Sequence, residues 1–168
     1  MATQLPELFL TASVKRMQLS AKEIGHCVAK LSEEQLWHRG ADHENSVANL
    51  LLHLEGNMRQ WFLHGIGGQP DVRERDAEFA LAPCAPTAKI YDCFSATLAE
   101  CCELIGSLPH ERLSEVINPQ PTGITGPMTI LEAIMRIVGH LQLHQGQIIL
   151  LTKQLSGADL DLSLPRKR

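Results

Sequence analysis

The chain has 168 residues, a net charge of −4, 44% hydrophobic residues and 20% charged residues. These values are typical of a soluble globular protein, and we expect residues 1–168 to form one domain. The acidic charge and the 4% aromatic content argue against a nucleic-acid-binding protein, which needs a basic surface and rings for base stacking. Residues 1–18 lack a signal sequence, and no apolar run approaches the roughly 18 residues of a membrane span, so we expect a cytoplasmic protein without membrane contact.

Four segments repeat apolar residues at alternating steps of three and four, which is the period of an amphipathic helix. They cover residues 6–31, 46–64, 87–107 and 129–156. No segment alternates with the period of two that is typical of a half-buried strand. The pattern predicts an all-α protein, and four helices that each carry one apolar stripe predict a four-helix bundle.

Local signals define several helix ends. Ser32 and Gln35 have the spacing of a capping box, which predicts a short extra turn after the first helix. Thr129 and Glu132 have the same spacing at the start of the fourth helix, and Gly157 follows its end. The connections after the second and third helices are each about twenty residues, longer than a hairpin loop requires. They could either cross over the bundle or cap one of its ends.

Histidines occupy the apolar face of two predicted helices. His140 and His144 lie four residues apart in the fourth helix, so their imidazoles project from nearly the same face. His53 lies at the edge of the stripe of the second helix. Burying imidazoles is costly unless their ring nitrogens have partners, and a divalent ion held by three neutral histidines is the simplest partner. The spacing alone also allows core histidines with ordinary hydrogen bonds.

The five cysteines do not form a recognisable disulfide or zinc-binding pattern. Their number is odd, and no two have CxxC spacing. Cys93 and Cys101 lie in the third predicted helix, where we expect them to be packing residues and not nucleophiles.

Two polar residues share a helix face with the histidines. Asn57 lies one turn beyond His53, and Gln147 lies one turn beyond His144. We expect Gln147 either to orient a ligand of the metal or contact a substrate, or to be an ordinary polar residue at the mouth of the bundle. We expect Asn57 either to line the cavity or to bond a neighbouring side chain. No general base is evident, since Glu55 faces away from His53 on a helix.

Charged residues and glycines near the histidines allow further interpretations. We expect Arg59 to join Arg75, Asp76 and Glu78 in an ion-pair network that pins the long connection to the second helix, although an arginine there could bind a substrate carboxylate. Glycines within the helices, each costing about 1 kcal/mol, would allow close helix approach or make room for a ligand. They are Gly56, Gly139 and Gly146.

Three motifs in order resemble those of the DinB-like superfamily of metal-dependent four-helix-bundle proteins. They are HLxGNxR at His53–Arg59, RDxEF at Arg75–Phe79 and HxxxHxGQI at His140–Ile148, as in a subgroup of unassigned function. The resemblance covers nearly the whole chain and extends to the tail at 161–168. It implies a DinB-like bundle in which one histidine of the second helix and two of the fourth bind a divalent ion.

The matching ligands in this chain are His53, His140 and His144. Zinc and nickel both suit imidazole ligands. Characterised relatives include bacillithiol-dependent thiol transferases and a mycothiol-dependent maleylpyruvate isomerase. The resemblance therefore implies a metal-dependent thiol S-transferase for small electrophiles, with a low-molecular-weight thiol as co-substrate, and we expect a homodimer. The alternatives are a non-catalytic metal- or ligand-binding stress-response protein and a dimeric bundle whose histidines are structural.

Overall fold

The structure, a computed structural model, describes residues 5–118 and 126–162. The described residues form α1 (Leu5–Val28), α2 (Glu33–Trp37), α3 (Val47–Met58), α4 (Arg75–Glu78), α5 (Thr87–Gly106) and α6 (Ile130–Ser156). A π-helix, η1 (Arg59–His64), continues α3, and a 3₁₀ helix, η2 (His110–Ser114), follows α5. Within the described residues the only β-pairing is an isolated bridge between Val116 and Thr129. The predicted all-α bundle is confirmed. Residues 163–168 of the tail motif lie outside the described residues.

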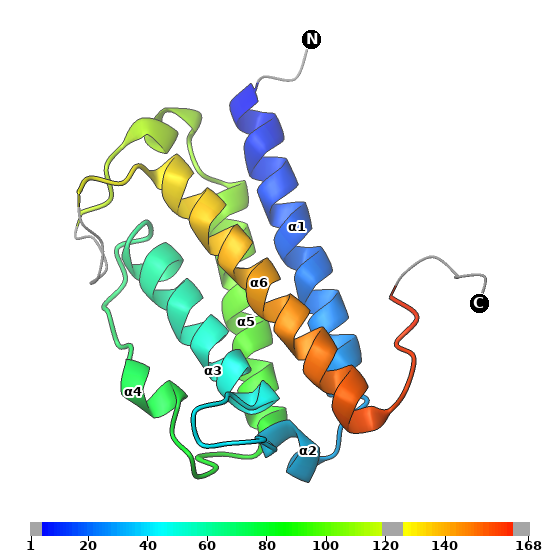
Figure 1. Cartoon of the computed structure of the whole chain (residues 1–168). Coiled ribbons are helices and arrows are strands. Elements are labelled where there is room, and N and C mark those ends of the chain that lie inside the picture. Colours follow the sequence, from blue (N-terminus) through cyan, green and yellow to red (C-terminus); the bar gives the residue numbers. More distant parts are fainter. Residues whose placement is uncertain (1–4, 119–125, 163–168) are drawn as a thin grey trace.

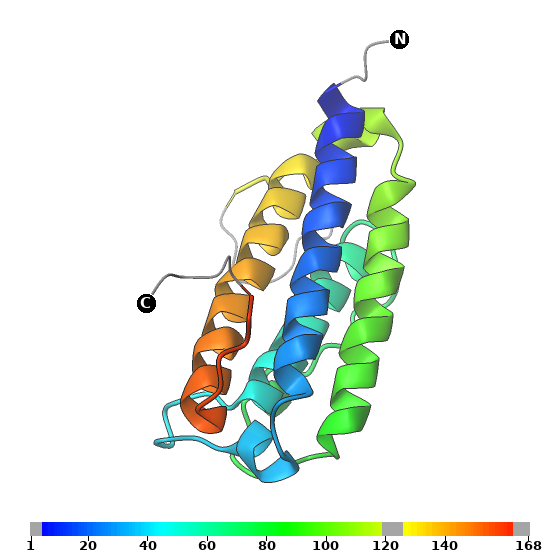
Figure 2. The same cartoon turned by 90° about the vertical axis from the view of Figure 1, so that its right-hand side faces the viewer.

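The four long helices form the bundle, in which α1 and α3 each pack against both α5 and α6. Chain direction, followed by colour in Figures 1 and 2, shows α1 and α6 running one way and α3 and α5 running the other. Because α3 and α5 are parallel, the connection at 65–86 must return along the length of the bundle, and it carries α4 beside α3 (Figure 1). The next connection carries η2 and covers one end of the bundle. The connection at 65–86 is thus a crossover, and the connection that carries η2 is a cap.

The predicted capping boxes are present. The side chains of Ser32 and Thr129 each accept a hydrogen bond from the backbone N–H three residues later. The side chains of Gln35 and Glu132 in turn accept one from the backbone N–H of Ser32 and Thr129. Gly157 ends α6 with a φ of 64°, a left-handed conformation that glycine adopts at low cost. These local bonds satisfy backbone groups that a helix terminus leaves unpaired. They fix both ends of α6, which carries two of the three histidines.

The predicted helix 46–64 differs from the structure in its last six residues, which are π-helical. A π turn takes an extra residue, so the helix face rotates relative to a 3.6-residue period. Trp61, Phe62 and Leu63 of this segment are all buried. The predicted helix 6–31 ends earlier, at Val28.

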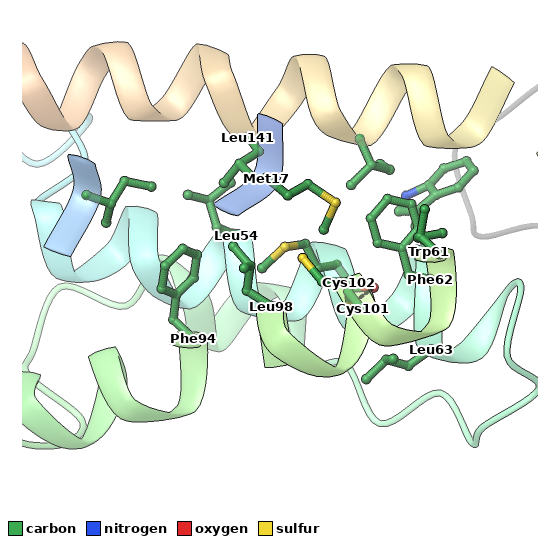
Figure 3. Close-up of a cluster of buried hydrophobic side chains, with 14 of the residues drawn as sticks. Met17, Leu54, Trp61, Phe62, Leu63, Phe94, Leu98, Cys101, Cys102 and Leu141 are labelled. Carbon is green, nitrogen blue, oxygen red and sulfur yellow. Dashed lines mark hydrogen bonds between the residues drawn. The ribbon is translucent and has the colours of Figure 1, made fainter. Parts of the chain in front are cut away.

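The core lies between the four long helices. The predicted stripe residues Met17, Leu54, Phe94 and Leu141, one from each helix, are at most 1% exposed. Figure 3 shows them converging with Leu98. Fully burying such a side chain stabilises the fold by about 1.5–3 kcal/mol. None of the described helices is both long and apolar enough to cross a membrane.

The cysteines fall into two groups. Cys101 is buried, as expected, and burial raises the pKa of its thiol. Burial also raises the pKa of Cys102 to about 11. Cys93, however, is exposed, so the prediction that it packs in the core is wrong. It directly precedes Phe94, and neighbouring residues on a helix lie about 100° apart, which turns Cys93 to solvent.

Candidate metal centre

Three imidazoles meet between α3 and α6. His53 Nε2 lies 2.9 Å from His140 Nε2, and the rings of His140 and His144 have centroids 4.4 Å apart. One possible ligand nitrogen from each histidine can be chosen so that all three lie within 4.8 Å of one another. Two imidazole nitrogens bound to one tetrahedral ion at about 2.0–2.1 Å are themselves about 3.3 Å apart. The histidine cluster could therefore hold a metal ion with small side-chain shifts.

Hydrogen bonds orient two of the three rings. His53 Nδ1 lies 2.9 Å from Glu78 Oε2, and His144 Nδ1 lies 2.6 Å from Gln147 Oε1. Both oxygens accept, so each Nδ1 carries the proton and donates it, which leaves Nε2 unprotonated. The Nε2 of His53 then accepts a hydrogen bond from His140 Nε2. Metal-binding histidines are commonly held in this way by a carboxylate or carbonyl oxygen. The bonds thus place the unprotonated nitrogens of His53 and His144 on the metal-binding side.

Glu78 belongs to a buried polar network that joins the crossover connection to α3. Arg73 binds the carboxylate with two nitrogens, Nε to Oε1 at 2.6 Å and Nη2 to Oε2 at 2.8 Å. Its third nitrogen donates to Gln60, which in turn donates to Asp71. Burial opposes the charge on Glu78, but hydrogen bonds from Arg73 and His53 outweigh it and hold the pKa of the carboxyl below its usual value. The network keeps Glu78 charged and fixed beside His53.

The network also explains one of the three helical glycines. A Cβ at Gly56 would lie less than 3.0 Å from Glu78 Oε1 and 3.3 Å from Arg73 Nε. Gly56 therefore lets the Glu78 carboxylate approach α3. Gly139 and Gly146 are exposed, and an added Cβ at either would meet no described atom within 4 Å.

Electrostatics favours the neutral form of two of the imidazoles, His140 and His144. The pKa of His140 is lowered to about 4, mainly because the ring is buried. The charges of the other two histidines, of Arg73 and of Arg136 act in the same direction. Burial also lowers the pKa of His144, while its hydrogen bond to Gln147 acts in the opposite direction. Neutral imidazole is the form that binds a metal, so His140 and His144 are ready to do so at neutral pH.

Other residues singled out from the sequence lie in different surroundings. Arg59 binds Glu55 at 2.9 Å and Thr97 at 2.8 Å, on the side of α3 that faces α5. Arg75 lies over the ring of Phe79. The predicted network of Arg59, Arg75, Asp76 and Glu78 is therefore wrong, because Glu78 pairs with Arg73. Glu55 faces away from His53, as expected. Asn57 is buried, and its Oδ1 has no hydrogen-bond partner among the described residues.

Arg73 and Gln60 were not identified from the sequence. Arg73 lies in a connection without helical periodicity, and its pairing depends on the path of that connection. The RDxEF motif was the one available signal, since it contains Glu78, but charge alone did not show which of the nearby arginines pairs with it.

A family model described as "Protein of unknown function (DUF1572)" matches residues 4–168. The chain belongs to this family. A crystal structure described as a conserved protein from Enterococcus faecalis has the same fold, with a TM-score of 0.71 over 94% of this chain and 100% of that one. At 16% identity, this likeness concerns the fold alone. No curated protein matches the chain in a sequence search.

Proposed function

We propose that this protein binds a divalent ion, zinc or nickel, through His53, His140 and His144, and that it belongs to the DinB-like superfamily. The observation that carries the proposal is the meeting of three imidazoles whose Nδ1 atoms, in His53 and His144, are already engaged by Glu78 and Gln147. A purely structural role for the histidines would not need three rings in one place. The neutral nitrogen donors suit both metals.

The reaction we propose is transfer of a low-molecular-weight thiol to a small electrophile. An ion held by these three imidazoles would leave coordination positions open, where it would lower the pKa of a bound thiol, so that the proton would pass to solvent water and the thiolate would be available as the nucleophile. Glu78 and Gln147 would hold two of the ligand rings in place during this chemistry. The buried Cys101 and Cys102 have raised pKa values and are unsuited to act as nucleophiles.

The test uses cobalt-substituted protein, whose spectrum reports sulfur binding. Glutathione, bacillithiol, mycothiol and coenzyme A are titrated separately, with an oxygen analogue of each as the control. The proposal expects a new charge-transfer band with one thiol, followed by metal-dependent conjugation of that thiol to an electrophile. No spectral change with any thiol, in protein that holds cobalt, would contradict the transferase and favour the non-catalytic metal- or ligand-binding protein.

We also propose a homodimer. Met135, Leu143 and Leu150 are 57–60% exposed, and their spacing of eight and seven residues places them on one outward face of α6. Exposed apolar groups arranged in a row commonly mark an interface. Sedimentation equilibrium should find a dimer for the wild type and a monomer for Leu143→Lys, and a monomeric wild type would refute the proposal.

A further inference from the structure

We propose that the ligand of this site carries a carboxylate and that Arg136 is the residue that binds it. The inference rests on the proposed metal function and adds the chemical class of the ligand. It follows from the position of Arg136 and from the charges around the three histidines.

Arg136 lies on the same side of α6 as the histidines. Arg136, His140 and His144 follow one another at intervals of four residues, so their side chains project from neighbouring turns of one face. The guanidinium of Arg136 lies over the ring of Trp61, with its central carbon 5.7 Å from the ring centroid. Trp61 is 4% exposed and lies in η1, which directly continues the helix that carries His53. Arg136 is exposed, and this cation–π contact joins its guanidinium to η1, which continues the helix that carries His53.

Arg136 stands one helical turn before His140, and no carboxylate among the described residues balances its charge. Arg73 is neutralised by its two bonds to Glu78, and Arg59 is bound by Glu55. Arg136 has no carboxylate partner among the described residues, and its one ring contact leaves its N–H groups free to donate.

A bound divalent ion would add two positive charges beside neutral imidazoles. The site would then attract an anion, and the planar fork of an arginine matches a carboxylate with two parallel hydrogen bonds. A phenol or a neutral thiol would leave this donor pair unused.

The experiment compares two thiols of equal size on cobalt-loaded protein, the anionic 3-mercaptopropionate and the neutral 3-mercaptopropionamide. Dissociation constants come from the charge-transfer band, after the cobalt content of each variant has been measured. Arg136→Met should weaken 3-mercaptopropionate at least tenfold and leave 3-mercaptopropionamide unchanged. Arg16→Met, which removes an exposed arginine of α1, serves as the matched control and should change neither constant.

The outcomes separate the inference from the function on which it rests. Equal affinity of the wild type and Arg136→Met for 3-mercaptopropionate would overturn the inference alone. If neither thiol changes the spectrum of the cobalt-loaded protein, the transferase proposal fails. Calorimetric titration of the wild type and Arg136→Met with propionate then tests whether Arg136 binds a carboxylate. Propionate binding that Arg136→Met weakens supports the inference, whereas equal or absent binding overturns it. A wild type that takes up no cobalt overturns both.

Discussion

The variant Gly56→Ala tests whether the buried Glu78 carboxylate controls the candidate metal centre. The added Cβ would lie less than 3.0 Å from Glu78 Oε1, whereas an ordinary contact begins at 3.4 Å. The carboxylate would have to move by at least about 0.4 Å, and it is held by bonds of 2.6 Å to Arg73 and 2.9 Å to His53. The far end of a glutamate can usually give way, but this one is fixed on both oxygens.

The expected magnitude follows from two opposing effects. Replacing glycine by alanine inside a helix stabilises it by about 1 kcal/mol. Breaking a buried ion pair costs about 3–5 kcal/mol when one partner is lost, and weakening it without loss costs a fraction of that. We therefore expect Gly56→Ala to lower the free energy of unfolding by roughly 1–2 kcal/mol. Metal affinity should fall about 10- to 100-fold, because the orientation of His53 is disturbed.

Gly139→Ala is the matched control, since it lies next to His140 in a helix and its added Cβ meets no described atom within 4 Å. It should stabilise the protein by up to about 1 kcal/mol and leave metal affinity unchanged. Urea unfolding of metal-free protein gives the stability, and calorimetric titration with zinc gives the affinity. If Gly56→Ala matches Gly139→Ala in both measurements, Glu78 does not hold His53 as described.

Three further predictions concern the same network, the histidines and the thiols. Glu78→Gln keeps the size of the side chain but removes its charge, so calorimetry should show a zinc affinity about 10- to 100-fold lower than that of the wild type. The control Glu74→Gln, at an exposed position, should leave the zinc affinity unchanged. Equal zinc affinities of Glu78→Gln and the wild type would exclude Glu78 from the site. The pKa of His140 is lowered from 6.5 to about 4, so the unfolded chain takes up its proton first, and acidification across this range should destabilise the metal-free protein. Between pH 7 and pH 4.5, His140 should lower the free energy of unfolding by roughly 1–2 kcal/mol, after allowance for solvent screening. In urea titrations at these two pH values, the free energy of unfolding of His140→Gln should fall by correspondingly less than that of the wild type. An equal fall in both proteins would count against the lowered pKa. A thiol reagent should label two cysteines of the folded protein quickly, the exposed Cys84 and Cys93, and fast labelling of any of the other three would contradict their burial.

Much of the fold follows from short-range features of the sequence. The capping box of Thr129 and Glu132 and the terminal Gly157 fix the limits of α6, because their bonds join residues a turn or less apart. The apolar period identifies the side chains that meet in the core. The four-residue spacing of His140 and His144 likewise places them on one face. That His53 lies opposite them is a long-range contact, which the apolar faces of the two helices suggested and the family resemblance supported.

The remaining features depend on contacts between distant segments. The π-helical segment at Arg59–His64 departs from the fixed helical period from which residues 46–64 were predicted. Arg73 and Glu78 reach His53 only because the crossover connection runs beside α3. Charge alone does not distinguish Arg59 from Arg73 as the partner of Glu78. The path of the connection decides between them.

The metal content of protein purified without an affinity tag tests the central claim most directly. Elemental analysis should find about one equivalent of zinc or nickel per wild-type chain and almost none in His53→Ala, His140→Ala or His144→Ala. The exposed His26→Ala is the control and should keep the wild-type content. A wild type that holds no stoichiometric metal even after incubation with zinc or nickel, or a histidine variant that retains the full equivalent, would contradict a metal centre built from these three residues.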